Sequence, residues 1–482
     1  MVFSNIEFLY VFLPLVLICY VVAPRFLKNA VLLVFSLIFY AWDKPIYALL
    51  MIFSIIMNYV FGLIVEKEKN KKKTGKWALV VAVVLNLLLL GIFKYTSFVV
   101  STVNHISGSD VSAINVTLPI VNKTIDLMHI ALPIGISFYT FQAMSYVIDV
   151  YRGHTKANKS IVGFGTYISM FPQLIAGPIV RYKTVDKEIR ERKETIEDFS
   201  EGIFRFTVGL GKKVLIANNV GALWDEIRVM ENAELSTFTA WLGLFAFTLQ
   251  IYFDFSGYSD MAIGLGRMFG FHFLENFDHP YESLSITEFW RRWHMSLGTW
   301  FKEYVYIPLG GNRHGMARQL VNIAIVWLLT GLWHGASWNF VIWGAYYAVL
   351  LLFEKVVLLK VLKKAPKIIS WIYTFLFVVL GWGIFSMSDM SHTKDYISAL
   401  FFNAGKGLAS KNGAFLALGS LILLVVGFIG SLSLPAKLAN KISSKNENLK
   451  LILKIVFVVV VMVLCTAFMV AGTYNPFLYF RF

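Results

Sequence analysis

The chain has 482 residues, of which 57% are hydrophobic and 15% charged, and its mean hydropathy is +0.65. A soluble domain is roughly half apolar and a quarter charged, so this composition excludes an ordinary soluble protein and indicates a membrane protein. The net charge of +15 does not indicate nucleic-acid binding, because the Lys and Arg residues lie between apolar stretches and form no single basic face. Cys19 and Cys465 lie in apolar stretches at opposite ends of the chain and predict neither a disulfide nor a metal site.

Apolar stretches recur along the whole chain. The first lacks the basic start and small-residue cleavage site of a signal peptide, which predicts an uncleaved span. The stretches expected to form spans or parts of spans are Phe8–Val22, Ala30–Trp42, Ile46–Val65, Trp77–Phe93, Ala131–Tyr151, Ile161–Ile175, Phe238–Phe255, Met261–Phe273, Leu320–Trp333, Asn339–Phe353, Ile368–Met387, Ala414–Ser433 and Leu451–Val470. About ten spans of roughly 20 residues fit this length. We predict an all-α, polytopic transmembrane bundle of about ten or more spans with re-entrant or interfacial helices.

The whole chain, 1–482, is predicted to be one membrane domain. It would consist of variable N-terminal spans over about 1–125, a motif-bearing core over about 130–355 and C-terminal spans over about 366–482. Such a chain is expected in the plasma membrane of the cell as a multi-pass protein.

Charged connectors predict the orientation in the membrane. The connector Glu66–Lys76 is dense in lysine, which places it on the cytoplasmic side. The polar stretch Ser97–His129 has Lys123 as its sole Lys or Arg, as a loop on the opposite side would. Between Arg181 and Lys213 the sequence is charged and amphipathic, which favours interfacial helices at the cytoplasmic surface over a span.

Charged groups within apolar sequence are costly unless they are paired or hydrated, and they are natural places to seek function. In Gln250–Gly264, Asp254 and Asp260 flank Gly257, which predicts a break between two stretches. On a continuous helix the two carboxylates would point about 120° apart, so they are no ready-made acid and base pair. The alternative is that each carboxylate accepts hydrogen bonds and stabilises an irregular segment.

A second polar cluster begins at Ser285 and Glu288, which form a capping box that starts a helix. That helix is predicted to carry one stripe of side chains from Trp290, His294, Leu297 and Phe301, and to end at Pro308, Gly310 and Gly311. Beside the histidine, Arg291 and Arg292 could bind the phosphates of an acyl donor, or anchor the helix at lipid headgroups.

The third cluster is Thr330–Trp338, with His334 between Gly331 and Gly335. An imidazole is suited to taking a proton from a hydroxyl near neutral pH, and glycines allow substrate or backbone to approach closely. A buried histidine can equally be a structural hydrogen-bonding group, and the residues alone leave both readings open.

Seven motifs occur in order along the chain. They are MVFSNIEFLYVFLP at the start, LPIGISFYTFQAMSYVIDVYRG (Leu132–Gly153), FPQLIAGPIVRY (Phe171–Tyr182), QIYFDFSGYSDMAIG (Gln250–Gly264), FWRRWHMSLGTWFKEYVYIPLGGNR (Phe289–Arg313), LLTGLWHGASWNFVIWG (Leu328–Gly344) and PFLYFRF at the end. Together they resemble the membrane-bound O-acyltransferase family, in the branch that contains the membrane subunit of bacterial alginate O-acetylation. The family's two histidine positions fall on His294 and His334.

The resemblance implies a helical ring whose thinned centre joins a cytoplasmic donor tunnel to an extracytoplasmic funnel, with His334 where they meet. By this resemblance His334 deprotonates or orients the accepting hydroxyl, and His294 binds, orients or supports the transfer. The groups that it assigns to donor binding or to support of the histidines are Asp254, Arg291, Trp290, Trp333 and Asn339. Tyr479, in the ending PFLYFRF, resembles tyrosines associated with acyl relay, although its aromatic neighbours also suit an interfacial anchor.

The same resemblance implies acetyl-CoA or another acyl thioester as donor substrate, with no bound cofactor and no metal. It also implies a separate extracytoplasmic partner resembling serine esterases, and a polysaccharide such as alginate, cellulose or peptidoglycan as final acceptor. Transfer of D-alanine from a carrier protein towards teichoic acid is the alternative within the enzyme class. A transporter of polysaccharide or lipid-linked sugar, or a scaffold for the partner, are the alternatives outside it.

Overall fold

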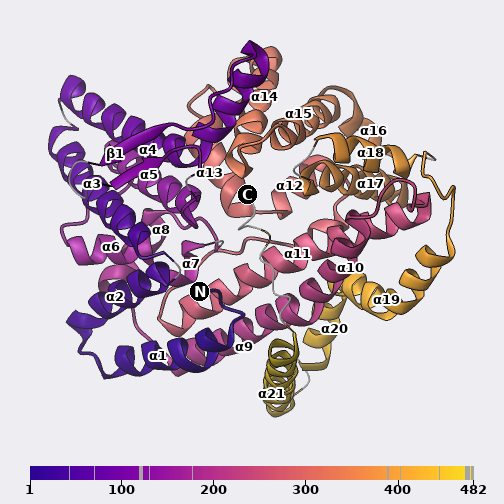
Figure 1. Ribbon diagram of the computed structural model, residues 1–482. Helices are drawn as coiled ribbons and strands as arrows, with labels where there is room; N and C mark the ends of the chain where they lie inside the picture. The colour runs from indigo at the N-terminus through magenta and orange to yellow at the C-terminus, as the bar shows by residue number, and fades with distance from the viewer. Residues whose placement is uncertain are drawn as a thin grey trace. The chain divides into compact units, whose positions relative to one another are not determined.

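The computed structural model describes residues 1–42, 44–69, 71–118, 123–129, 131–175, 177–387, 390–401, 403–443, 446–472 and 478. These residues are helical almost throughout (Figure 1). They form two compact units: unit 1 is Met1–Val2, Glu7–Thr195 and Phe269–Phe273, and unit 2 is Phe3–Ile6, Ile196–Met268 and Leu274–Phe482. The prediction of a single membrane domain in three parts stays a prediction.

Unit 1 consists of helices and one hairpin. Its elements are η1 (Phe8–Phe12), α1 (Leu13–Val22), η2 (Arg25–Leu27), α2 (Lys28–Ala41), α3 (Ile46–Glu68), α4 (Lys72–Ser107), β1 (Asn115–Leu118), β2 (Lys123–Asp126), α5 (Ile136–Arg152), α6 (Ile161–Ser169), α7 (Phe171–Leu174) and α8 (Tyr182–Glu191). The helices α3, α4 and α5 pack against one another. Asn58 on α3 and Asn86 on α4 are fully buried and exchange amide hydrogen bonds of 3.1 and 2.7 Å, which satisfies both groups within the apolar pair.

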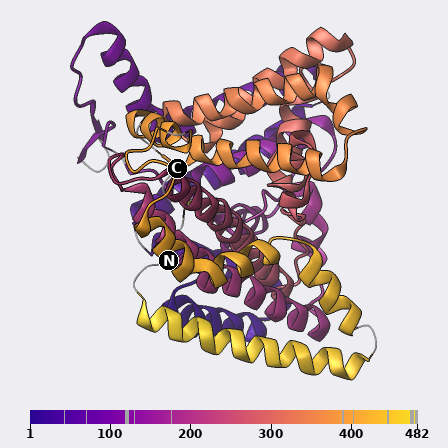
Figure 2. The same ribbon diagram turned by 90° about the vertical axis from the view of Figure 1, so that its right-hand side faces the viewer.

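All the secondary-structure elements in the described part of unit 2 are helices. Its elements are α9 (Ile196–Gly211), η3 (Lys212–Ala217), α10 (Asn218–Arg228), α11 (Thr237–Met268), η4 (Pro280–Glu282), α12 (Ile286–Arg292), α13 (Met295–Phe301), η5 (Lys302–Tyr306), α14 (Gly315–His334), α15 (Trp338–Phe353), η6 (Glu354–Leu358), α16 (Leu359–Leu362), α17 (Lys367–Ser386), α18 (Met390–Leu400), α19 (Lys411–Gly430), α20 (Leu434–Ser443) and α21 (Glu447–Ala471). The helix α11 packs along α9, and α14 pairs with α15. Figure 2 shows α21 as the long yellow helix, which also packs on α9.

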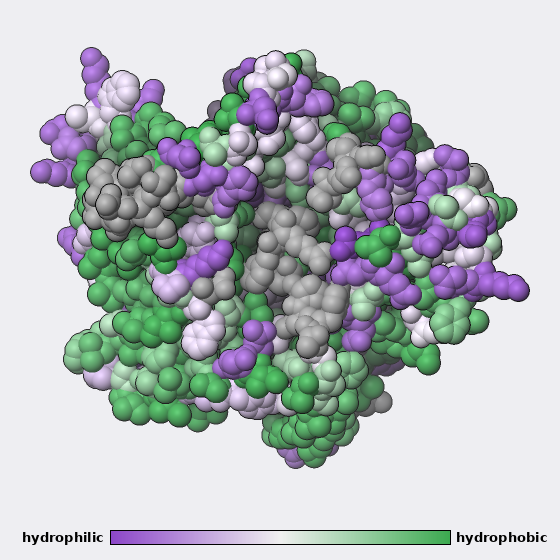
Figure 3. Space-filling view, viewed as in Figure 1, coloured by the Kyte–Doolittle hydropathy of each residue, from purple (hydrophilic) through white to green (hydrophobic). Residues whose placement is uncertain are grey.

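Seven helices within the described ranges are long and apolar enough to cross a membrane, namely Ile46–Glu68, Lys73–Ser107, Thr237–Met268, Gly315–His334, Lys367–Ser386, Lys411–Gly430 and Glu447–Ala471, and Phe8–Val22 is a shorter apolar helix. Apolar residues cover broad areas of the surface in Figure 3. Exposed valine, leucine and isoleucine side chains in such numbers suit a lipid surrounding, and the prediction of an all-α polytopic membrane protein is confirmed.

The polar stretch after the fourth apolar segment differs from the prediction. We expected a loop over Ser97–His129, but α4 continues to Ser107 and the hairpin of β1 and β2 follows, with Asn115 opposite Asp126. The hydroxyls of Thr96 and Ser107 donate to carbonyls four residues earlier in α4, at 2.8 and 2.7 Å. The hydroxyl of Thr96 is thus satisfied within its own helix, and α4 continues beyond it as far as Ser107.

The predicted break at Gly257 is wrong. Helix α11 runs unbroken for 32 residues and joins the two stretches that we had separated. Gly257 instead permits a close approach to α9: a Cβ atom on Gly257 would lie 2.8 Å from the carbonyl oxygen of Gly209, and one on Gly209 would lie 2.4 Å from the carbonyl oxygen of Gly257. The glycine therefore serves packing between helices, as small residues commonly do in membranes.

Candidate active site

The helix that begins at the capping box is shorter than predicted. Ser285 Oγ accepts a hydrogen bond of 3.0 Å from the N–H of Glu288, as expected. In a capping box the Glu288 carboxylate would accept from the N–H of Ser285, but here it accepts from the N–H of Leu284. Helix α12 then ends at Arg292, and α13 begins at Met295. The continuous stripe predicted from Trp290 to Phe301 is wrong, because the chain turns at His294.

His294 adopts a left-handed backbone conformation, with φ of 46°, which is uncommon for a residue other than glycine. Asn276 holds it there: its backbone carbonyl accepts from the N–H of Met295 at 2.9 Å, and its Oδ1 accepts from the N–H and hydroxyl of Ser296 at 3.1 and 2.8 Å. The same Oδ1 lies 3.1 Å from His294 Nδ1, so Nδ1 carries the proton and Nε2 is the accepting nitrogen. A strained backbone secured by its neighbours is typical of functional positions.

His334 is the last residue of α14 and is buried. We had considered that the glycines on either side of His334 leave space for a substrate. They instead allow α15 to pack closely against α14. A Cβ atom on Gly331 would lie 2.4 Å from the carbonyl oxygen of Phe340, and one on Gly335 would lie 2.0 Å from its ring. The close pairing of α14 and α15 therefore fixes the position of His334.

Aromatic rings surround both histidines. The His334 ring lies 5.1 Å from the ring of Trp343 and 5.5 Å from that of Phe385, measured between centroids. The ring of Trp333 contacts both histidines, at 5.1 Å from that of His334 and 6.0 Å from that of His294. The structure thus brings His294, Trp333 and His334 into one buried cluster in unit 2, although they come from the α12–α13 junction and from α14.

Trp290 extends this cluster. Its ring lies 5.4 Å from that of Trp343 and 4.8 Å from that of Tyr347. Trp290 Nε1, Trp343 Nε1 and Tyr347 OH are buried and have no hydrogen-bond partner within the described part of the chain. Buried donors in proteins nearly always have partners, so these three groups are available to bind a polar ligand atom or water.

In the described part of the chain, the polar partners of Asp254 are Lys213 and Leu478 and not residues of the histidine cluster. Its Oδ1 is 2.5 Å from Lys213 Nζ, and its Oδ2 accepts a hydrogen bond of 2.9 Å from the N–H of Leu478. Asp260 is bound separately, by Lys212 Nζ at 2.7 Å and Arg205 Nε at 2.9 Å. Among the described residues, Asp254 thus pairs with one cation and Asp260 with two. We had considered that both would stabilise an irregular segment, but both lie on the continuous helix α11.

The remaining predicted site residues have different surroundings. Arg291 is exposed at the end of α12, whereas Asn339 is buried at the start of α15 and its Oδ1 accepts from the hydroxyl of Ser337. Tyr479 lies outside the described residues. Sequence reasoning missed Asn276 and Lys213, since an asparagine in a polar loop and a lysine beside other cations carry no distinguishing signal before the fold is known.

The fold and this buried cluster define a polytopic helical membrane protein with two histidines enclosed by aromatic rings. The model of the membrane-bound O-acyltransferase family matches residues 156–392. A probable alginate O-acetylase of Pseudomonas aeruginosa is 42% identical over 435 residues, which are 89% of this chain and 81% of that protein. The peptidoglycan O-acetyltransferase of Helicobacter pylori is 33% identical over 86% of this chain and 81% of its own length.

The teichoic acid D-alanyltransferase of Bacillus subtilis is also similar, at 30% identity over 54% of this chain and 70% of its own length. The chain belongs to the membrane-bound O-acyltransferase family. It is a multi-pass O-acyltransferase of the bacterial cell membrane, and an acyl donor is implied by that activity.

Proposed function

We propose that the chain passes an acetyl group from a cytoplasmic thioester, acetyl-CoA, across the membrane for O-acetylation of a polysaccharide outside the cytoplasm, with His334 as the catalytic residue. The observation that carries the proposal is the burial of His334 beside His294 within one aromatic cluster of unit 2. The names of the alginate and peptidoglycan relatives support acetyl transfer to a glycan. Transfer of D-alanine towards teichoic acid is the alternative, carried by a relative that matches less of the chain.

The chemistry requires two proton transfers, to and from His334, and one exchange of bonds at the acetyl carbon. His334 takes the proton of the accepting hydroxyl, whose oxygen bonds to the acetyl carbon while the carbon–sulfur bond breaks, and the proton then passes to the leaving thiolate. His294, with Nε2 as its accepting nitrogen, orients the hydroxyl or the donor. The buried N–H groups of Trp290 and Trp343 are suited to donating hydrogen bonds to the acetyl carbonyl oxygen as it gains negative charge.

The other predicted residues take supporting roles in this proposal. Trp333 packs against both imidazoles, Asn339 fixes the start of α15 through Ser337, and Arg291 is exposed and suited to the phosphates of the donor. A separate extracytoplasmic protein resembling serine esterases completes the transfer to the polysaccharide. Asp254 positions the C-terminal segment through Leu478.

Tyr479 is proposed to carry the acetyl group transiently. Support comes from its sequence neighbour Leu478, which is buried and bound to Asp254. Tyr479→Phe removes the accepting hydroxyl and should abolish polymer acetylation with normal protein level. Normal acetylation in this variant would exclude the relay.

The catalytic role of His334 is tested by His334→Ala in cells that express the full chain. Loss of a general base lowers the rate by about 100-fold or more, so acetyl groups on the surface polysaccharide should fall to background by mass analysis. The matched control is His105→Ala, an exposed histidine at the end of α4. Near-normal acetylation in His334→Ala, with normal protein level, would falsify the assignment. Failure of polymer export without any change in acetylation would favour the transporter.

A further inference from the structure

Unit 1 contains a basic pocket that the acyl-transfer chemistry does not use. Its volume is about 480 Å³. The pocket lies where α1 connects to α2, beside the end of α8 and the segment before α6, and its cationic side chains are those of Arg25, Lys28, Arg190 and Arg192. Glu194 contributes a carboxylate to the lining, so positive charge is in excess.

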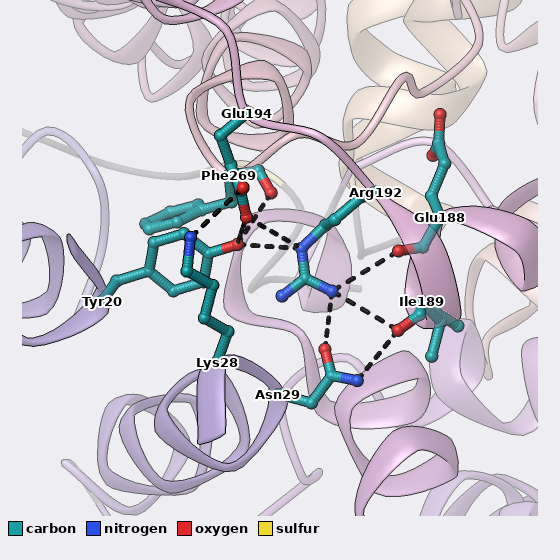
Figure 4. A network of polar contacts seen from close by, with 8 residues as sticks. All are labelled: Tyr20, Lys28, Asn29, Glu188, Ile189, Arg192, Glu194 and Phe269. Atoms are coloured by element: carbon teal, nitrogen blue, oxygen red, sulfur yellow. Dashed lines mark hydrogen bonds and ion pairs between the residues drawn. The ribbon is translucent and has the colours of Figure 1, made fainter. Parts of the chain in front are cut away.

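Arg192 lies at the centre of the network of polar contacts around this pocket (Figure 4). Its Nε donates to the hydroxyl of Tyr20 at 2.8 Å, and its Nη1 donates to Asn29 Oδ1 at 2.6 Å. The side chain of Arg192 is only 6% exposed. Its Nη2 is buried and has no hydrogen-bond partner in the described part of the chain. A buried guanidinium N–H without an acceptor is costly, so this atom indicates an oxygen ligand supplied from outside the protein.

Of the other three cationic side chains that line the pocket, two form ion pairs with carboxylates and one does not within the described ranges. Lys28 Nζ lies 3.2 Å from Glu194 Oε2, and Arg190 pairs with Asp186. Arg25 is exposed and has no ion pair among the residues that the structure describes. The pocket therefore offers the free charge of Arg25 and the unmet donor of Arg192 to an anion, and a planar guanidinium suits phosphate oxygens.

Apolar side chains stand directly beside the charged ones. Val21 and Val22 at the end of α1 are 72% and 79% exposed, and Phe26, next to Arg25, is 81% exposed. The boundary of a bilayer suits this arrangement, because the apolar side chains can contact lipid acyl chains there while the cationic side chains contact lipid headgroups.

The pocket lies near the cytoplasmic connector of unit 1. Asn158 and Ser160 line it, and the neighbouring Ala157 donates its N–H to Glu66 Oε1 at 3.2 Å, at the start of the lysine-rich connector Glu66–Lys76. The bias of lysine towards the cytoplasm therefore places the pocket at the cytoplasmic leaflet, where anionic lipids attract basic segments.

We propose that this pocket binds the phosphate headgroup of an anionic membrane phospholipid. Arg25 meets the phosphate at the rim, and Arg192 Nη2 donates to one of its oxygens within the pocket. The acyl chains lie along the exposed side chains of Val22 and Phe26. Bound lipid would in this way tie the α1–α2 connection to α8 in unit 1.

The test measures lipid binding to the purified full chain by native mass spectrometry. The lipid probes are phosphatidylglycerol and phosphatidylcholine, and the soluble competitors are inorganic phosphate and CoA. Phosphatidylglycerol is expected to bind the wild-type chain in preference to the zwitterionic lipid. Arg25→Gln should weaken that binding about fivefold, the usual effect of one cation near a lipid surface. The variant retains the fold, because Arg25 is exposed and the contacts of Arg192 are unchanged.

Lys193→Gln is the matched control, since Lys193 is exposed next to Arg192 but does not line the pocket. Unchanged phosphatidylglycerol binding in Lys193→Gln alongside weakened binding in Arg25→Gln supports the proposal. Equal binding in both variants overturns it. Displacement of the lipid by millimolar inorganic phosphate or CoA also overturns it, because the site would then be one for soluble phosphates.

Discussion

Lys213 and Asp254 form a buried ion pair in the interior of unit 2. Their side chains are 3% and 2% exposed, and the ion pair measures 2.5 Å. Removing two charges from water is expensive, and their attraction repays that cost only while both are present. Asp254 also accepts from Leu478, so its negative charge has two partners within the structure.

Lys213→Met should therefore destabilise the protein by about 3 to 5 kcal/mol, because it leaves the carboxylate of Asp254 buried without its cation. The measurement is the midpoint of thermal unfolding of the detergent-purified chain. The double variant Lys213→Met/Asp254→Leu should regain most of the loss, since no buried charge remains. If the double variant is less stable than the single one, the ion pair is not the source of the effect.

At this scale the sequence identified the two histidines and the acidic residues but not their partners. His294 and His334 were recognisable because they lie within ordered motifs and apolar sequence. Asn276 was not, because it acts through a turn at His294 that the helical pattern of neighbouring residues concealed. Whether His334 reacts is decided by the His334→Ala variant, not by its position.

Among the helices, the pairing of α9 with α11 depends on glycine. A Cβ atom on Gly209 would lie 2.4 Å from the carbonyl oxygen of Gly257 and 2.6 Å from the backbone nitrogen of Met261. These are backbone atoms of a helix and cannot move aside independently. The same helix surfaces carry Lys212 and Asp260, whose ion pair needs the helices at this separation.

Gly209→Ala should lower the stability of unit 2 by about 1 to 3 kcal/mol or more, the usual cost of overpacking. The matched control is Gly419→Ala in α19, where a Cβ atom would meet nothing within 4 Å. That substitution should leave stability unchanged or raise it by up to about 1 kcal/mol, because alanine favours a helix. Thermal unfolding of both variants in one detergent checks the prediction, and equal midpoints would contradict it.

Most of the helices could be predicted from runs of apolar residues, as α14, α17 and α21 show. Two of the errors arose because a helix was expected to end at residues that are polar or weak helix formers. Gly257 was interpreted as a break because glycine is a weak helix former, but packing against α9 maintains α11 there. The stretch from Ser97 was interpreted as a loop because it is polar, but α4 continues through it to Ser107. The break at His294 was missed for the opposite reason, since local residues there favour a helix.

On the scale of a whole compact unit, the network around Arg192 joins segments that are distant in the sequence. The Tyr20 hydroxyl donates to Glu194 Oε1 at 2.5 Å and also lies 3.1 Å from the carbonyl oxygen of Phe269, across 174 and 249 residues. Lys28 pairs with the same carboxylate at 3.2 Å. Burial alone would raise the pKa of Glu194, but the hydrogen bond from Tyr20 and the contact with Lys28 hold the pKa below its ordinary value.

A carboxyl whose pKa is lowered by folding contributes stability above its unfolded pKa, and that contribution is lost as the pH falls through the folded value. Glu194→Gln should therefore lower the unfolding midpoint of the full chain at pH 7. The difference from wild type should shrink as the pH falls below about 4, the ordinary range of a glutamate, because the wild-type carboxyl is then protonated as well.

Glu191→Gln is the control for this pH dependence. Glu191 is exposed near the end of α8, and no ion pair of its carboxylate occurs in the described part of the chain. Its substitution should change the midpoint little at any pH, because exposed charges contribute little to stability. If both variants show the same profile, the fall in stability reflects the net charge of the protein. If only Glu194→Gln loses its effect in acid, the connection between α1, α2 and residues 269–273 depends on this carboxylate.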